Sequence, residues 1–299
     1  MPRPDINQAR QFLAAHARVL DRRRLERLLD GAPPEPVRDA VAAYRNPDGG
    51  FGHGLEPDGR GPGSQPIAVA LALQTLHEAD AWDPDLARGA CDWLERTAPA
   101  AGGATFADPS AEGWPHAPWF RPSEGLATSV TITGQIASPL HARGFEHPWL
   151  ERATEWMWST IDEIAADAGT GLEGIGGGYQ MLGVTRFLDR VPDRDRAAAA
   201  IDRVGPLLFD RGLVELDPDA AGETHGPLVF APSPDSIARS LFDPATITVH
   251  LDRLVADQRD DGGWTFDWDA WSPAAEADWR GSVTVDALRT LQVNGRLGE

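Results

Sequence analysis

The chain has 299 residues, of which 41% are hydrophobic and 24% are charged, and its formal net charge is −19. This composition is typical of a soluble globular protein, and the negative charge argues against nucleic acid as a partner because a polyanion would be repelled. All 27 basic residues are arginine, which excludes chemistry that requires a lysine, such as Schiff-base formation.

Two further features bound the class of protein. The single cysteine, Cys91, can form neither an internal disulfide nor a cysteine cluster for zinc, and we expect an inert packed thiol there. No run of about eighteen apolar residues is present, and the first residues lack the apolar core of a signal peptide. We therefore expect a cytoplasmic protein without a transmembrane segment.

Helical spacing of apolar residues begins at Ile6 and predicts a first helix over residues 6–29. Ser64 is expected to cap a markedly apolar helix over 67–76, and Asp235 to cap a short helix. The other helices expected, in chain order, cover residues 36–45, 84–94, 126–142, 148–166, 178–190, 193–209, a short stretch from about 234, 244–258 and 281–293.

Helices of two kinds alternate along this pattern. One helix of each pair is apolar on nearly all sides and rich in small residues, so it must be buried, whereas its partner is amphipathic. The alternation predicts two concentric rings of helices. We therefore expect an all-α fold, an α/α toroid of about six inner and about six outer helices, formed by residues 1–299 as a single domain.

Two short sequence phrases lie between predicted helices. They are Asn46–Gly52 (Asn-Pro-Asp-Gly-Gly-Phe-Gly) and Gln258–Trp264 (Gln-Arg-Asp-Asp-Gly-Gly-Trp). Both place Asp-Gly-Gly before an aromatic residue, after one helix and ahead of an apolar one, as in a helical repeat. Asp48 and Asp261 are expected to form Asx turns before the glycines. The aromatic residues that follow are expected to fill space between helices.

These phrases resemble the repeat of the squalene cyclase and protein prenyltransferase β-subunit superfamily. Gln258 to Trp264 is similar to the Gln-…-Gly-…-Trp motif of that family, and Asn46 to Phe51 is a partial copy. The resemblance implies an α/α toroid whose central cavity holds an isoprenoid, with Gln258 tethering helix ends. Residues 56–66, 231–236 and 272–281 also resemble phrases in a group of bacterial proteins of similar size that has no established activity.

The chain departs from this superfamily in its catalytic motifs. The Asp, Cys and His zinc site of prenyltransferases has no counterpart, because Cys91 lies in the middle of a predicted outer helix. The Asp-x-Asp-Asp proton donor of one class of terpene cyclases and the Asp-rich metal motif of the other are both missing. Zinc-dependent prenyl transfer is therefore not expected, and we expect neither a metal site nor a cofactor.

Five long loops, 46–63, 99–125, 168–178, 210–233 and 260–280, lead into the apolar helices. In an α/α toroid they lie at one end, where we expect them to form the mouth of the main pocket. The candidates for a general acid are Glu56, Asp58, Asp235, Asp267 and Asp269. The candidates for substrate contacts are His53, Arg60, Trp119, Phe120, Arg121, Trp268, Trp271, Trp279 and Arg280.

Several candidates also fit simpler interpretations. His53 with Glu56 and Asp58 is a weak metal or acid–base signal, because close His and carboxylate residues are common in loops. Asp267 and Asp269 alternate with tryptophans and fit either a paired acid site or solvated charges, since a perturbed carboxylate needs a desolvated neighbourhood.

Three hypotheses for function remain open. The first is a terpene-cyclase-like protein that binds an apolar small molecule such as an isoprenoid, protonates it with a carboxylic acid and stabilises positive charge with aromatic faces. The second is a carbohydrate-active toroid, because paired carboxylates beside tryptophans also suit glycoside hydrolysis. The third is a binding or scaffold toroid without catalysis, favoured by the missing motifs. The sequence does not indicate an oligomeric state.

Overall fold

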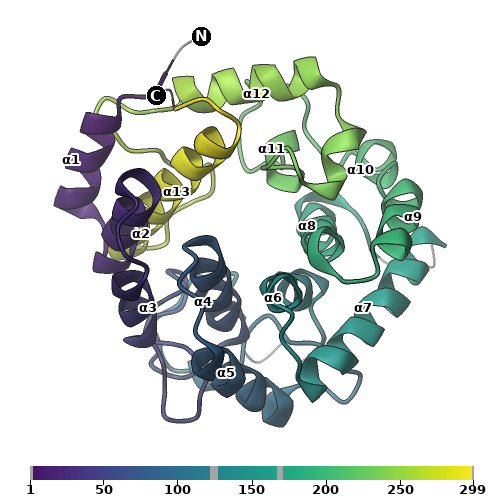
Figure 1. Ribbon diagram of the computed structural model, residues 1–299. Coiled ribbons are helices and arrows are strands. Elements are labelled where there is room, and N and C mark those ends of the chain that lie inside the picture. Colours follow the sequence, from purple (N-terminus) through teal and green to yellow (C-terminus); the bar gives the residue numbers. More distant parts are fainter. Residues whose placement is uncertain (1–2, 122–126, 167–170, 298–299) are drawn as a thin grey trace. The chain divides into compact units, whose positions relative to one another are not determined.

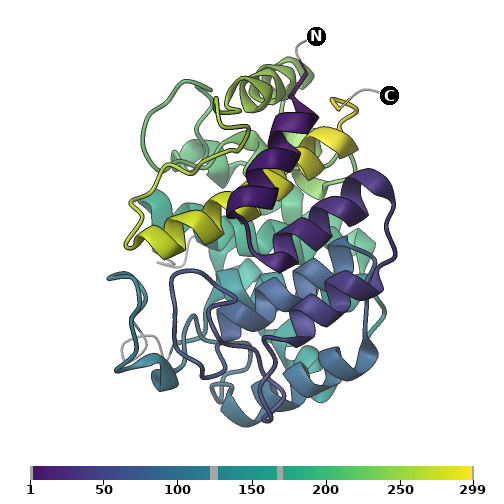
Figure 2. The same ribbon diagram turned by 90° about the vertical axis from the view of Figure 1, so that its left-hand side faces the viewer.

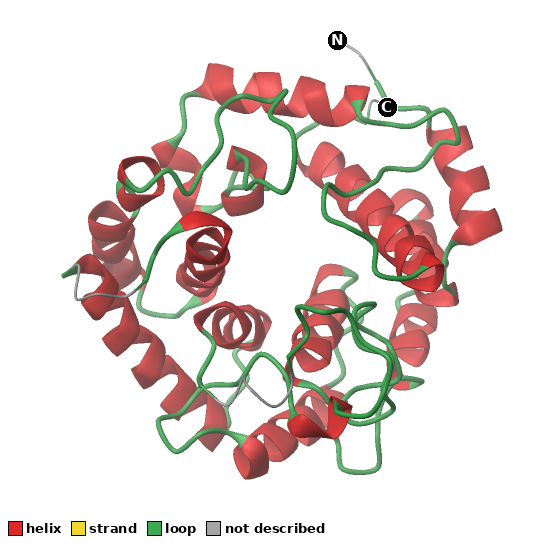
Figure 3. Ribbon diagram, turned by 180° about the vertical axis from the view of Figure 1, so that it is seen from behind, coloured by secondary structure: helices red, strands yellow, loops and turns green. Residues whose placement is uncertain are grey.

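The computed structural model describes residues 3–121, 127–166 and 171–297. Within these ranges every regular element is a helix (Figure 3), and β pairing is limited to two isolated bridges. The predicted all-α class is therefore confirmed for the described part of the chain. The predicted loops 99–125 and 168–178 and the start of the helix predicted over 126–142 lie partly outside it. No described helix is long and apolar enough to cross a lipid bilayer.

Most helices lie where the apolar spacing predicts them, and prolines such as Pro84 and Pro148 stand in their first turns. The α-helices are α1 (Ile6–His16), α2 (Val19–Asp30), α3 (Glu35–Ala42), α4 (Pro66–Glu78), α5 (Pro84–Thr97), α6 (Val130–Ala142), α7 (Pro148–Ala165), α8 (Gly174–Arg190), α9 (Arg194–Val204), α10 (Leu207–Asp210), α11 (Pro227–Phe230), α12 (Pro244–Ala256) and α13 (Pro273–Val293). Two 3-10 helices are η1 (Pro109–Ala111) and η2 (Ile237–Leu241).

α8 begins at Gly174 rather than at residue 178, and α11 lies within the predicted loop 210–233. Three other predicted helices differ more from the observed ones. The first is divided into α1 and α2, because Ala17 between them is extended. The helix expected to end at residue 209 is divided into α9 and α10, because Pro206 lacks the N–H that would continue the hydrogen-bond ladder. The last begins at Pro273 rather than near residue 281, because the Ser272 side chain caps an earlier turn by accepting a backbone N–H at 3.1 Å.

Both predicted N-cap residues are wrong. Gln65 stands at the N-cap of α4, and the Ser64 hydroxyl instead donates a hydrogen bond to Asp48 Oδ1 at 2.8 Å. Ser236 stands at the N-cap of η2, while Asp235 is exposed to solvent. In both cases the helix begins one residue later than the capping pattern suggests.

The described residues group into two compact units. Unit 1 contains Met1–Pro33, Glu173–Gly178 and Gly205–Glu299, and unit 2 contains Pro34–Leu172 and Tyr179–Val204. That residues 1–299 form a single domain stays a prediction.

Unit 2 consists of packed helix pairs. α4 and α6 pack side by side, and α6, α5 and α9 all pack on α7 (Figure 1). α4 is buried on most sides, as its apolar sequence predicts. α6 meets the unit 2 part of α8 where a Cβ added to Gly134 would lie 2.1 Å from the Gly183 carbonyl oxygen. The two backbones can approach this closely only because both positions lack a side chain.

Unit 1 brings distant parts of the chain together. α13 packs on α1, α2 and α12, so that the purple and yellow ribbons lie side by side in Figure 2. Arg24 on α2 forms an ion pair with Asp286 on α13 at 2.5 Å. The Gln258 side chain accepts the Asp5 N–H at 2.6 Å and donates to the Asp5 carbonyl at 2.8 Å. Its expected role as a tether is confirmed, and it joins the end of α12 to the start of α1.

The two Asp-Gly-Gly phrases form the same turn. In the first copy the Asn46 N–H donates to the Gly50 carbonyl at 2.8 Å, and the Gly50 N–H donates to Asp48 Oδ1 at 2.9 Å. The expected Asx turns are confirmed, and the aromatic residues that follow are buried. The second copy repeats these bonds at 2.8 and 3.0 Å with Arg259, Asp261 and Gly263.

A third copy, which the sequence pattern does not reveal, lies at Pro99–Ala104 ahead of α6. The Gly102 N–H donates to the Pro99 carbonyl at 2.9 Å, as Gly49 and Gly262 do to the equivalent carbonyls at 3.0 and 2.8 Å. The φ angles of these three glycines are 94°, 96° and 91°, which glycine adopts without steric cost. The third copy lacks both the aspartate and the aromatic residue. Pro99 has no N–H to donate the first bond and Gly103 has a φ of 75°, so the Gly102 bond and φ alone identify this copy.

Each turn packs on the backbone of a further helix in the same way. The pairs are Gly49 with Gly89 of α5, Gly102 with Arg152 of α7 and Gly262 with Gln8 of α1. Four residues further along each receiving helix an aromatic side chain also lies against the turn, namely Trp93, Trp156 and Phe12. The turn after α3 therefore packs on α5, and the turn after α5 packs on α7. The turn after α12 packs on α1 in the same manner.

Candidate functional site

The candidate residues fall into one group in each unit. Those in unit 2 are His53, Glu56, Asp58, Arg60, Trp119, Phe120 and Arg121, and those in unit 1 are Asp235, Asp267, Trp268, Asp269, Trp271, Trp279 and Arg280. Each group is considered on its own.

The unit 2 group forms where two of the predicted long loops join. The Arg60 N–H donates to the Pro115 carbonyl at 3.0 Å, and the Ala117 N–H donates to the Asp58 carbonyl at 2.8 Å. These bonds flank an isolated antiparallel bridge between Gly59 and His116. The loop before α4 is thereby fixed against the loop before α6, as expected for these two loops.

Two acidic side chains are buried at this junction. Glu56 is 4% exposed and Asp58 is 8% exposed. Asp58 Oδ2 accepts the indole N–H of Trp119 at 2.9 Å, and Glu56 Oε2 accepts the backbone N–H of Asp58 at 3.0 Å. Burial of charged carboxylates is costly unless hydrogen bonds compensate, so these bonds account for part of their placement.

Aromatic side chains from the loop before α6 lie against the loop that carries this pair. Phe120 is fully buried, and a Cβ on Gly59 would lie 3.0 Å from its ring, so the loop backbone rests on the ring. Trp119 is 43% exposed and Trp114 is 50% exposed, which leaves large aromatic faces open to solvent. His116 was not among the candidates, although its ring lies 6.0 Å from that of Phe120.

The other two unit 2 candidates lie at the edge of this arrangement. His53 is exposed and has a φ of 58°, and its Nε2 lies 2.8 Å from Asn46 Oδ1. The ring therefore belongs to the hydrogen-bond network of the first turn. Arg121 is exposed. Among the described residues no group of three or more His, Cys, Asp or Glu is placed to hold a metal ion.

The acidic candidates of unit 1 are exposed. Asp235, Asp267 and Asp269 all face solvent, so they lack the desolvated neighbourhood that a general-acid role would require. The neighbouring Trp268 stacks on Phe266 with ring centroids 4.5 Å apart. Its ring meets that of Trp279 edge-on at 5.3 Å, so these candidates pack on one another.

Arg280 is used to hold the second turn. Its guanidinium forms an ion pair with Asp261 at 2.8 Å and lies 4.5 Å from the centroid of the Phe12 ring. Burial alone would raise the pKa of the Asp261 carboxyl, but the hydrogen bonds from the Gly263 N–H and from Arg280 outweigh it and lower that pKa. Arg280 thus supports the fold rather than standing open to a ligand.

Cys91 lies in α5 and is fully buried. Burial raises the pKa of its thiol to about 12, so the thiol is protonated at neutral pH. The expectation of an inert packed residue is confirmed.

Two tryptophans of the C-terminal loop differ in one hydrogen bond, and we expect loss of the indole N–H to destabilise the protein much more at one than at the other. Trp264 Nε1 donates to the Leu254 carbonyl at 2.7 Å, whereas Trp271 Nε1 is buried without a hydrogen-bond partner in the described part of the chain. Trp264→Phe should lower the free energy of unfolding by about 2 kcal/mol, through a lost bond and a cavity. Trp271→Phe should cost less than about 0.5 kcal/mol or stabilise, because an unpaired buried donor is removed. Urea unfolding measures both, and equal losses would contradict this assignment.

Comparison of the chain with models of known protein families finds no match, and comparison with curated proteins finds no significant match either. The interpretation of the site therefore rests on its own geometry and on the repeated turn.

Proposed function

We propose that the chain forms an α/α toroid related to the terpenoid cyclases, as the Asp-Gly-Gly turns suggest. Two turns of one geometry, and a third that shares their glycine N–H bond, support this proposal, since each follows an amphipathic helix and precedes another helix. The packing of the Gly262 turn on α1 also supports it. The Gly49 and Gly102 turns pack on α5 and α7 in the same manner, and a toroid requires such a contact between its last turn and its first helix.

We further propose that the protein binds an isoprenoid chain and acts on it with the buried acidic pair of unit 2. The observation that carries this proposal is the placement of Glu56 and Asp58, buried together in one loop, beside Trp119 and Phe120 from another. A carboxylic acid can protonate an alkene when burial keeps it neutral, and aromatic faces stabilise the cation that forms.

Hydrogen bonds hold the two carboxyl groups in place. Asp58 Oδ2 accepts the Trp119 indole N–H, and Glu56 Oε2 accepts the Asp58 backbone N–H. The acid role requires that a bound apolar chain exclude water from the pair. Burying a fifteen-carbon chain would contribute on the order of 10 kcal/mol before entropic costs.

A carbohydrate ligand is the second candidate, and two observations favour it. The half-exposed side chains along one face of α6 are polar, namely Thr131, Gln135 and Ser138, whereas the isoprenoid hypothesis expects few hydrogen-bonding groups there. The exposed faces of Trp114 and Trp119 would also suit the stacking of sugar rings.

Tryptophan fluorescence separates these candidates. Under the isoprenoid proposal, farnesyl or geranylgeranyl analogues quench the fluorescence at micromolar concentrations and oligosaccharides do not. Trp119→Phe, which removes the bond to Asp58, should weaken binding about fivefold, while Trp114→Phe in the same loop should change it less than twofold.

Catalysis is tested separately by analysing products after incubation with the prenyl substrate. Asp58→Asn should abolish cyclised product while retaining the melting temperature of the parent. Binding of oligosaccharides that depends on both tryptophans would favour the carbohydrate function instead. If neither prenyl compounds nor oligosaccharides bind, the hypothesis of a binding or scaffold toroid without catalysis is favoured.

A further inference from the structure

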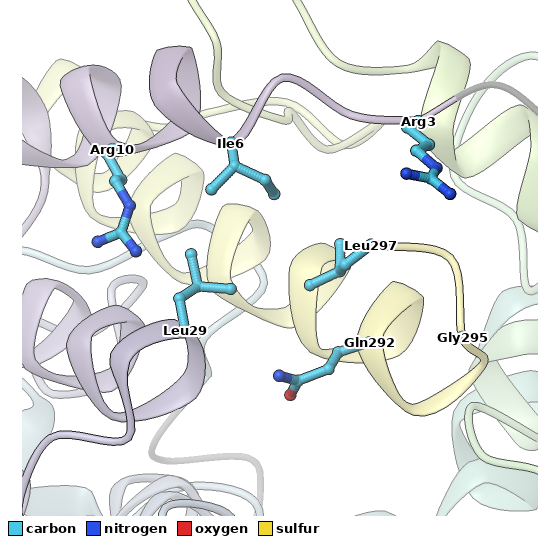
Figure 4. Close-up of a pocket in the computed structure, with 7 residues that line it drawn as sticks. All are labelled: Arg3, Ile6, Arg10, Leu29, Gln292, Gly295 and Leu297. Carbon is cyan, nitrogen blue, oxygen red and sulfur yellow. The ribbon is translucent and has the colours of Figure 1, made fainter. Parts of the chain in front are cut away.

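A pocket of about 630 Å³ lies in unit 1, where α1 and α2 meet the end of α13 (Figure 4). This volume is in the range of small-molecule sites. Three aliphatic side chains from separate elements contribute to the lining, Ile6 of α1, Leu29 of α2 and Leu297 after α13, and all three are half-buried. The pocket therefore offers apolar surface that the fold itself does not cover.

Two arginines stand on either side of this apolar surface, and their states differ (Figure 4). Arg10 is held by Asp30 through two hydrogen bonds of 2.8 and 2.5 Å, so a local carboxylate balances its charge. Arg3 is exposed and forms no ion pair with the described residues. The described residues thus leave one positive charge at the pocket unbalanced.

The backbone that carries Arg3 is fixed. Pro4 is buried, and both backbone groups of Asp5 bond to the Gln258 side chain. A guanidinium on an anchored backbone offers five donors to an oxyanion at little cost in backbone entropy. The net charge of the chain is −19, so its overall electrostatic potential repels anions. Binding of an anion in this pocket therefore depends on the Arg3 guanidinium.

We propose that this pocket binds an aliphatic chain with a single anionic headgroup, a carboxylate or a phosphate monoester. The headgroup lies at Arg3 and the chain lies over Ile6, Leu297 and Leu29. This site lies in unit 1 and is independent of the acidic pair in unit 2, so it goes beyond the function proposed above.

Calorimetric titration of the full chain tests the proposal, with decanoate, decyl phosphate, decanol and decyltrimethylammonium below their micelle concentrations. Decanoate or decyl phosphate should bind at least fivefold more tightly than decanol, and the cation should bind most weakly. The stronger of the two anions identifies the headgroup. Arg3→Gln should weaken binding of that anion about fivefold and leave decanol unchanged.

Matched variants locate the effect. Arg259→Gln removes an equal charge from an exposed arginine in the same unit, outside this pocket, and should leave anion binding unchanged. Trp119→Phe should also leave it unchanged, which separates this site from the isoprenoid proposal. The proposal is overturned if neither anion binds, if decanol binds as tightly as the anions, or if Arg3→Gln and Arg259→Gln have equal effects.

Discussion

Gly262→Ala is expected to lower the free energy of unfolding by about 3 kcal/mol or more. Gly262 has a φ of 91°, and an added Cβ would lie 2.3 Å from the backbone oxygen of Gln8 on α1. The unfavourable left-handed backbone and the steric contact both destabilise the alanine variant. Rotation of a side chain cannot relieve the contact, because the position of the Cβ is fixed by the backbone and the Gln8 oxygen is itself a backbone atom. Relief would require the turn to move away from α1.

Gly31→Ala is the matched control. Gly31 also has a positive φ, 62°, but its added Cβ would meet nothing within 4 Å. Gly31→Ala should therefore lower the free energy of unfolding by only about 1 kcal/mol, the cost of a left-handed backbone at alanine. Thermal and urea unfolding of both variants measure the difference. If the two alanines cost the same, the packing of the turn on α1 is not what requires glycine.

Gly134→Ala should also destabilise strongly, although alanine favours helix more than glycine does. The gain in helix propensity is about 1 kcal/mol, but the Cβ would lie 2.1 Å from the Gly183 carbonyl oxygen of α8. Separating two packed helices opens space along their whole contact, so we expect a net loss of about 3 kcal/mol or more.

Gly176→Ala in α8 provides the opposite case. Its added Cβ would meet nothing within 4 Å and its φ is negative, so the propensity gain should appear undiminished, about 0.5–1 kcal/mol of added stability. Differential scanning calorimetry should show that the two substitutions shift the melting temperature in opposite directions. A stabilising Gly134→Ala would refute the close approach of α6 and α8.

The candidate site was only partly accessible to sequence reasoning. Residue type and loop position were enough to select Glu56, Asp58 and Trp119, but the Trp119 bond to Asp58 joins residues 61 positions apart and needs the folded loops. The charge of Arg280 suggests a substrate contact, yet its guanidinium forms an ion pair with Asp261 in the same unit. Charge and spacing reveal which groups are present, whereas pairing depends on which groups fold against each other.

Local sequence patterns are enough to predict the helical class, most helix positions and two of the three turns. These follow from apolar spacing, proline positions and Asp-Gly-Gly chemistry, which act over a few residues and so can be read locally. The tertiary structure alone decided the rest. The turn at Pro99–Ala104 lacks the aspartate and the aromatic residue, and only its backbone and its packing on α7 reveal it. The burial of Glu56 and Asp58, against the exposure of Asp267 and Asp269, was likewise decided by packing, because desolvation depends on neighbours that local sequence does not specify.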